Sequence, residues 1–151
     1  ALLTEASRMP GLDGQKMSKS YNNTITLRED EATVTHKVKR MPTDPARGRR
    51  TDPGDPERCP VWQLHQVYSD ESTKEWVQQG CRSAGIGCLE CKQPVIDGIL
   101  REQTPMRERA QTYLDDPQLV RHIIADGNEK ARKLAQETMR DVREAMGLNY
   151  S

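Results

Sequence analysis

Two lysines and two serines lie within five residues near the beginning of the chain. The run reads Lys16, Met17, Ser18, Lys19 and Ser20. A mobile loop with two ammonium groups and two hydroxyls can close over the phosphates of ATP and stabilise the negative charge that develops on departing pyrophosphate. Gly11 and Gly14, just before this KMSKS segment, allow the backbone to approach a ligand closely and to hinge. A solvated surface loop has the same composition, so these residue types alone leave both interpretations open.

The four cysteines of the chain follow one another as Cys59-x21-Cys81-x6-Cys88-x2-Cys91. A C-x2-C pair can bring two sulfurs onto one metal or one cluster because the intervening turn is short. Gly85 and Gly87 give the backbone between the second and third cysteines the freedom to curl. Free cysteines are also often buried in a core. The spacing favours a metal centre over four buried thiols, and four thiolates suit either zinc or an iron–sulfur cluster.

Positive charge is concentrated between residues 36 and 50. The basic residues there are His36, Lys37, Lys39, Arg40, Arg47, Arg49 and Arg50. Only Asp44 opposes them, which leaves a local charge of about +5 with histidine neutral. This stretch either follows an RNA backbone or forms a solvated helix face and loop.

The remaining histidines and tryptophans carry weaker signals. None of His36, His65 and His122 has a metal-binding spacing, and His65 is the one reserve ligand because it follows Cys59 by six residues. Trp62 and Trp76 are expected to pack in the core rather than to stack on bases.

The chain that must position these residues has 151 residues, 34% of them hydrophobic, with no Phe and with 23 basic and 23 acidic side chains. This composition allows one modest helical core. No segment has the roughly 18 apolar residues of a transmembrane helix, and no secretory signal is present. We therefore expect a cytoplasmic protein, in which cysteines favour metal binding over disulfides.

Periodicity and capping signals predict an all-α bundle of about six helices. Residues 1–27 are expected to form a loop, with a short strand over 24–27, and a helix follows from Glu29 until Pro42. A proline-rich loop covers 42–60. Further helices are expected over 62–68, from a capping box of Ser72 and Glu75 to Gly80, over 95–100, after Thr104–Pro105, after Asp116–Pro117, and over 131–146.

The string from Gly11 to Asn23, GLDGQKMSKSYNN, closely resembles the signature of the class I aminoacyl-tRNA synthetases, and it is most similar to their tryptophan and tyrosine branch. Residues 24–44 and 144–148 resemble the tryptophanyl members. The resemblance implies that residues 1–27 end a catalytic nucleotide-binding domain and that 28–151 form a helical anticodon-binding domain with its four-cysteine site at 59–91. The chain would then be a C-terminal fragment, inactive alone, because the HIGH-type motif and the amino-acid pocket lie upstream.

The same resemblance implies the chemistry. Tryptophan and ATP, with Mg²⁺, would form tryptophanyl-adenylate, which then charges tRNA(Trp) in a homodimeric enzyme. Lys16 and Lys19 would contact the ATP phosphates, while Ser18 and Ser20 support the loop with Met17 between them. A subset of these enzymes carries a similar four-cysteine pattern that holds a [4Fe–4S] cluster, although the Cys59–Cys81 interval here is one residue shorter. The alternatives are a tyrosyl-tRNA synthetase fragment and a non-catalytic, metal-containing RNA-binding module.

Overall fold

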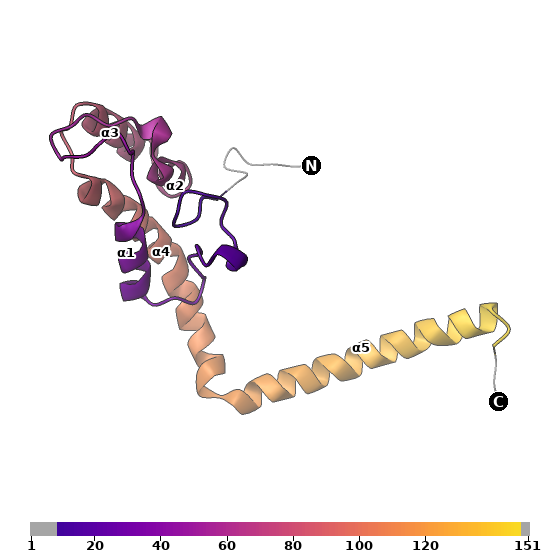
Figure 1. Ribbon diagram of the computed structural model, residues 1–151. Helices are drawn as coiled ribbons and strands as arrows, with labels where there is room; N and C mark the ends of the chain where they lie inside the picture. Colours follow the sequence, from indigo (N-terminus) through magenta and orange to yellow (C-terminus); the bar gives the residue numbers. More distant parts are fainter. Residues whose placement is uncertain (1–8, 149–151) are drawn as a thin grey trace. The chain divides into compact units, whose positions relative to one another are not determined.

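The computed structural model describes residues 9–148, and its regular elements there are all helices, joined by loops that include residues 22–30 and 41–55 (Figure 1). Its elements are the 3₁₀-helix η1 (Lys19–Tyr21), α1 (Glu31–Arg40), the 3₁₀-helix η2 (Pro56–Arg58), α2 (Pro60–Tyr68), α3 (Glu71–Arg82), α4 (Cys88–Asp115) and α5 (Pro117–Ala145). The chain forms two compact units, the first ending at Arg107 and the second beginning at Glu108. The predicted all-α class is confirmed for the described part of the chain, whereas the predicted division after residue 27 stays a prediction.

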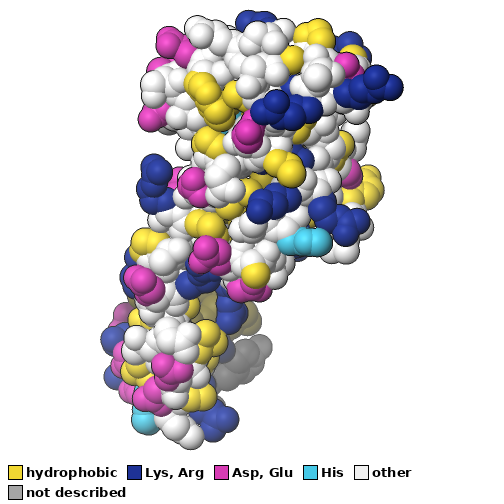
Figure 2. Space-filling view, turned by 90° about the vertical axis from the view of Figure 1, so that its left-hand side faces the viewer, with side chains coloured by type: hydrophobic (Ala, Val, Ile, Leu, Met, Phe, Trp, Pro, Cys, Tyr) yellow, Lys and Arg dark blue, Asp and Glu magenta, His cyan; other side chains and the backbone are white. Residues whose placement is uncertain are grey.

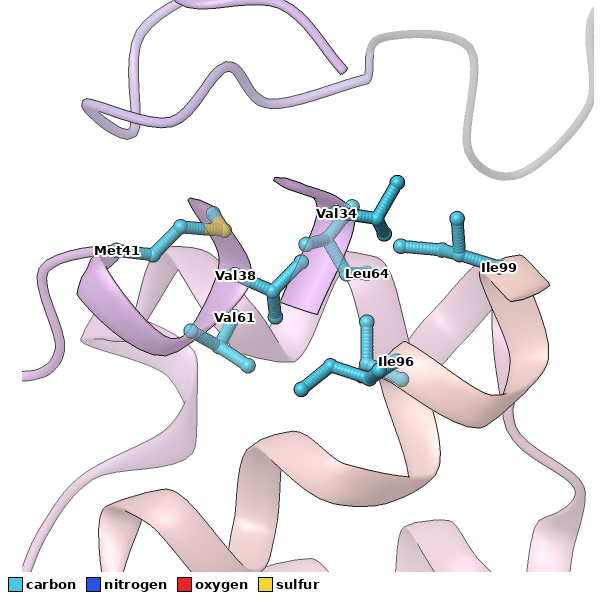
Figure 3. Close-up of a cluster of buried hydrophobic side chains, with 8 residues drawn as sticks. Val34, Val38, Met41, Val61, Leu64, Ile96 and Ile99 are labelled. Carbon is cyan, nitrogen blue, oxygen red and sulfur yellow. The ribbon is translucent and has the colours of Figure 1, made fainter. Parts of the chain in front are cut away.

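The core of the first unit lies where α1, α2 and α4 meet (Figure 3). Its buried side chains are Val34, Val38, Met41, Val61, Leu64, Val95, Ile96 and Ile99. Burying each Val, Ile or Leu stabilises the fold by ~1.5–3 kcal/mol before entropy is counted. Asp30 begins α1, because its carboxylate accepts a hydrogen bond from the Thr33 N–H at 2.9 Å. The helix ends before Pro42, as predicted.

A second, smaller cluster lies beside this core and contains Trp62, Val77 and Ile86. Cys59 and Cys91 pack against it. Trp62 is therefore a core residue, as predicted. Trp76, on α3, is 43% exposed, so its predicted core position is wrong.

Helix α4 differs most from the sequence prediction, since it runs without interruption through Pro94 and Pro105. The prediction that Thr104 caps a new helix at Pro105 is wrong. Side chains on both sides of Pro105 bind the same segment of the loop before α1. Gln103 donates to the Thr26 carbonyl at 3.3 Å, and Arg107 donates to the Glu29 carbonyl at 2.9 Å. These tertiary contacts offset the backbone hydrogen bond that proline cannot make.

Three other local predictions are also wrong. Residues 24–27 form no strand, and the single β-bridge among the described residues joins Pro10 to Lys16. Helix α3 begins at Asp70, whose carboxylate accepts the Thr73 N–H at 2.8 Å, two residues before the predicted cap. It also continues past Gly80, where a Cβ would lie 2.7 Å from a methyl carbon of Ile86. That glycine serves close packing rather than helix termination.

The second unit contains the end of α4 and the whole of α5. Asp116 caps α5 by accepting the N–H groups of Gln118 and Leu119, and Pro117 occupies the first helical position, as predicted. Gly147 follows the helix at φ +67, the left-handed conformation expected of a residue that closes a helix. The predicted segments at 117–124 and 131–146 are one helix. No helix in the described part of the chain is long and apolar enough to cross a membrane.

Candidate functional site

The KMSKS segment lies in a tight loop that precedes α1. Lys16 pairs with Pro10 in the isolated bridge, and the Ser18 hydroxyl begins η1 by accepting the Ser20 N–H at 3.2 Å. Lys16, Lys19 and Ser20 are exposed. Both lysines are therefore exposed on a backbone that is held in place, and their ammonium groups are accessible to an anion.

Asn23 holds this loop together, a role that the sequence prediction missed. Its side chain is only 4% exposed. The amide nitrogen donates to the Asp13 carboxylate at 2.7 Å and to the Lys16 carbonyl at 3.2 Å, while the amide oxygen accepts the Ser18 N–H at 2.7 Å. The hydrogen bond from Asn23 lowers the pKa of Asp13, as does the one from the Gln15 N–H. Any side chain on Gly11 would overlap Asn23, which explains the glycine there.

We expect Asn23→Ala to loosen the loop without unfolding the helices. The substitution leaves the half-buried Ser18 N–H and the Lys16 carbonyl without their partner, at a cost of ~1–3 kcal/mol each if water does not replace it. Hydrogen exchange should quicken for amides in residues 11–23 and stay the same in α3. Asn128→Ala, on exposed α5, serves as the matched control, and unchanged exchange at Ser18 would contradict the role given to Asn23.

The four cysteines line one cavity of about 20 Å³ in the first unit. They reach it from the start of α2 (Cys59), the last turn of α3 (Cys81) and the first turn of α4 (Cys88 and Cys91). Gly54 permits the close approach, since a Cβ there would lie 2.8 Å from the Cys81 sulfur. Among residues 9–148, however, no three His, Cys, Asp or Glu side chains form a group that could hold a metal ion. The predicted metal site is therefore a cavity shared by four free thiols, without a preformed site for one ion.

Burial is the largest influence on the pKa values of Cys59, Cys81 and Cys91. It raises the pKa of Cys91 to about 12, with further increases from the other three cysteines. Burial also raises the pKa of Cys59, against the N–H groups of Val61 and Trp62, which lower it. Cys81 is raised by burial too, while the Arg47 guanidinium lowers its pKa. Thiolates at this place require a cation that offsets their lost hydration.

Two buried cations line the same cavity. Arg47 is 9% exposed, and it donates to the Cys81 sulfur at 3.8 Å and to the Ile86 carbonyl at 2.6 Å. Its Nε has no hydrogen-bond partner. Lys92 is 3% exposed and donates only to backbone carbonyls. Within the described residues, neither side chain forms an ion pair with a carboxylate.

Asp44 is the one carboxylate that lines the cavity, and it interacts with groups other than Arg47 and Lys92. It accepts the N–H groups of Ala46 and Asp55 and lies 3.8 Å from Arg58, and these contacts lower its pKa. Arg47 thus contacts the Cys81 sulfur, and Lys92 lines the same cavity as the four sulfurs. Four thiolates around Zn²⁺ or around a [4Fe–4S]²⁺ core carry a net charge of about −2, which these two cations match.

His65 touches the site without being one of its ligands. The ring is fully buried, with Nε2 3.4 Å from the Cys91 sulfur and Nδ1 2.8 Å from the Ser69 hydroxyl. Burial lowers its pKa to about 4, so the ring is neutral at physiological pH. Both ring nitrogens have partners, so His65 is a hydrogen-bond neighbour of Cys91, and its use as a reserve metal ligand stays a prediction. His36 and His122 are exposed and lie in no such cluster.

The basic stretch divides into structural and exposed residues. Arg47 is buried in the cysteine cavity, and Lys37 pairs with Glu29 and donates to the Thr24 carbonyl at 2.9 Å. His36, Lys39, Arg40, Arg49 and Arg50 remain exposed. Arg50 lies 3.3 Å from Glu90 across a groove of about 490 Å³ that residues 47–50 and 87–90 line. Figure 2 shows Lys and Arg interspersed with Asp and Glu on the face it presents. Only part of the predicted charge is therefore available to RNA.

Comparison with known proteins adds to this geometry. Residues 1–100 match the family model described as tRNA synthetases class I (W and Y). The chain is 79% identical over 150 residues to a tryptophan–tRNA ligase of Ralstonia nicotianae, covering 99% of this chain and 38% of that protein. It is 44% identical over 151 residues to a tryptophan–tRNA ligase of Thermotoga maritima, covering 99% of this chain and 46% of that protein. The chain thus spans less than half the length of these relatives.

Solved structures agree at the level of the fold. Tryptophanyl-tRNA synthetase from Campylobacter jejuni, crystallised with ADP and tryptophan, superposes with a TM-score of 0.80 at 32% identity, covering 93% of this chain and 44% of that one. Tryptophanyl-tRNA synthetase from Aeropyrum pernix superposes with a TM-score of 0.57 at 32% identity. The superposition covers 69% of this chain and 31% of that one.

Proposed function

Because the chain belongs to the family of class I tRNA synthetases for tryptophan and tyrosine, we propose that it is part of a tryptophan–tRNA ligase. The relatives at 79% and 44% identity are both tryptophan–tRNA ligases, which favours tryptophan over the tyrosine alternative. The observation that carries the proposal is the pinned loop with its two exposed lysines, which suits binding of ATP phosphates. Tryptophan-dependent pyrophosphate exchange by the full-length protein, with tyrosine as the competing substrate, tests it.

In this proposal the KMSKS segment acts on ATP. Lys16 and Lys19 bind the phosphates of ATP, with Mg²⁺ as the accompanying cation, and stabilise charge on departing pyrophosphate. Met17, Ser18 and Ser20 shape the loop that carries them. The helical remainder of the chain meets the anticodon of tRNA(Trp), in a cytoplasmic homodimer. The isolated chain is expected to form no adenylate. A non-catalytic RNA-binding module would instead bind tRNA while the full-length protein exchanged no pyrophosphate.

We further propose that Cys59, Cys81, Cys88 and Cys91 bind one [4Fe–4S] cluster. The shared cavity, the two cations that line it and the unpartnered Arg47 Nε support a dianionic four-thiolate centre. The spacing of the four cysteines, which resembles the pattern of the cluster-bearing members of the family, favours the cluster over zinc. When bound, the cluster cross-links the loop before α2 to α3 and α4, which is a structural role.

The exposed arginines of the loop give a test of RNA binding. We expect replacement of both Arg49 and Arg50 by alanine in the full-length enzyme to weaken tRNA binding and to flatten its dependence on salt by about one unit per arginine. Arg47→Ala should instead lower stability, because Arg47 is buried. Fluorescence titrations at several salt concentrations measure the slope, and an unchanged slope would mean that the two arginines are only solvated.

A further inference from the structure

Two side chains of α4 hold the loop that joins the KMSKS segment to α1. Gln103 is 4% exposed and donates to the Thr26 carbonyl at 3.3 Å. Arg107, one turn further along the helix, donates to the Glu29 carbonyl at 2.9 Å and to the Thr104 hydroxyl at 3.1 Å. Both terminal nitrogens of the guanidinium are therefore fixed. These contacts with the loop join parts of the chain that are 77 and 78 residues apart.

Helix α1 and the core bind the same loop. Lys37 of α1 donates to the Thr24 carbonyl at 2.9 Å and forms an ion pair with Glu29. The Glu29 carboxylate in turn accepts the Thr26 N–H at 3.1 Å. Ile25, between these contacts, packs against the core of the first unit. The loop is therefore anchored to the first unit at several points along its length.

The anchored loop follows directly on the hydrogen bonds that shape the KMSKS segment. Asn23 binds the Lys16 carbonyl and the Ser18 N–H. The carbonyl of the next residue, Thr24, is the one that Lys37 binds. Because no residue lies between these two sets of hydrogen bonds, a shift of the loop is passed on to the KMSKS segment. The place of the two KMSKS lysines relative to the first unit therefore depends on the side chains that bind the loop.

We propose that Gln103 and Arg107 are positioning residues for adenylate formation, which set where the two KMSKS lysines meet the phosphates of ATP. This inference rests on the function proposed above for the KMSKS segment. Neither α4 side chain needs to touch ATP, because each acts through a backbone carbonyl of the loop. A misplacement of reacting groups by about 1 Å can cost roughly 10²-fold in rate. Loss of either hydrogen bond to the loop should therefore slow the reaction.

Single-turnover adenylation by the full-length protein tests this role. Arg107→Met removes the hydrogen-bond donors and keeps an unbranched side chain, and we expect it to lower the rate by roughly 10-fold. Gln103→Met should have a similar effect, and it carries the test if Arg107→Met does not fold by circular dichroism. Affinity for tryptophan should stay the same in both variants, because the KMSKS segment acts on phosphates.

Two further variants serve as controls for Arg107→Met. Arg107→Lys keeps a donor for the Glu29 carbonyl and should recover most of the rate. Arg109→Met makes the same change at an exposed position of α4 and should adenylate as the wild type does. A rate in Arg107→Lys as low as that in Arg107→Met would mean that the hydrogen bond to the loop is not what matters.

A double-mutant cycle separates positioning of the lysines from a general loss of stability. In the Lys19→Ala background, Arg107→Met should slow adenylation by a smaller factor than in the wild type, because the contact that it misplaces has already been removed. Equal factors in the two backgrounds, or wild-type rates in both Arg107→Met and Gln103→Met, would overturn this inference and leave the proposed function intact. Full-length wild-type protein that shows no tryptophan-dependent pyrophosphate exchange would overturn the proposed function, and this inference with it.

Discussion

We expect Lys19→Ala in the full-length enzyme to lower the rate of adenylate formation by roughly 10²–10³-fold. Lys19 lies in η1, exposed, with no carboxylate partner among the ion pairs of residues 9–148. Its charge is therefore free to bind pyrophosphate as negative charge develops there. Losing one such contact in the transition state costs ~2–4 kcal/mol. Single-turnover adenylation followed by quenched flow gives the rate directly.

The control for this prediction is the affinity of the variant for tryptophan, measured beside its adenylation rate. Tryptophan affinity should change little, because the loop acts on the phosphates and not on the amino acid. Lys133→Ala, a lysine exposed on α5 and paired with Glu129 at 3.0 Å, should leave both quantities unaltered. An adenylation rate equal to that of the wild type would remove Lys19 from the mechanism and leave the KMSKS segment as a surface loop.

The parts of the fold that depend on neighbouring residues could be predicted from the sequence. Asp116 and Pro117 start α5 and Pro42 follows the end of α1 because capping and proline effects act within a few residues. The continuity of α4 through Pro105 could not be predicted in this way. It depends on hydrogen bonds from Gln103 and Arg107 to a loop that lies 77 and 78 residues earlier in the chain.

The same distinction between local and long-range interactions applies to the residues of the candidate sites. Cysteine spacing was enough to predict that four thiols share one place, and the KMSKS letters were enough to find two exposed lysines. The buried roles of Asn23 and Arg47 were missed, because both residue types are ordinarily exposed. Arg47 also has partners that lie 34 and 39 residues away in the chain. Lys92 bonds to carbonyls 51 and 53 residues away. The position of Lys92, a charged residue directly after Cys91, is the feature of the sequence that indicates its place beside the cysteines.

The second large effect is expected at the cysteines. Protein purified without oxygen should be brown and contain about four irons per chain, since each cysteine of a [4Fe–4S] cluster binds one iron. Cys88→Ser and Cys91→Ser should each lose the colour and most of the iron. They should also lower the melting temperature, because a bound structural metal adds its binding free energy to folding. Iron and sulfide assays, absorption spectra and thermal unfolding monitored by circular dichroism provide the measurements.

A matched substitution separates loss of the metal from damage to the helix. Leu89 lies between the two cysteines in the first turn of α4 and is 61% exposed. Leu89→Ser places the same new side chain one residue from Cys88 without removing a sulfur, so colour, iron and melting temperature should match the wild type. Colourless protein with one zinc per chain would favour zinc. Protein that stays free of metal after anaerobic reconstitution, with four reactive thiols and unchanged stability in Cys88→Ser, would show that the cavity holds buried thiols and nothing more.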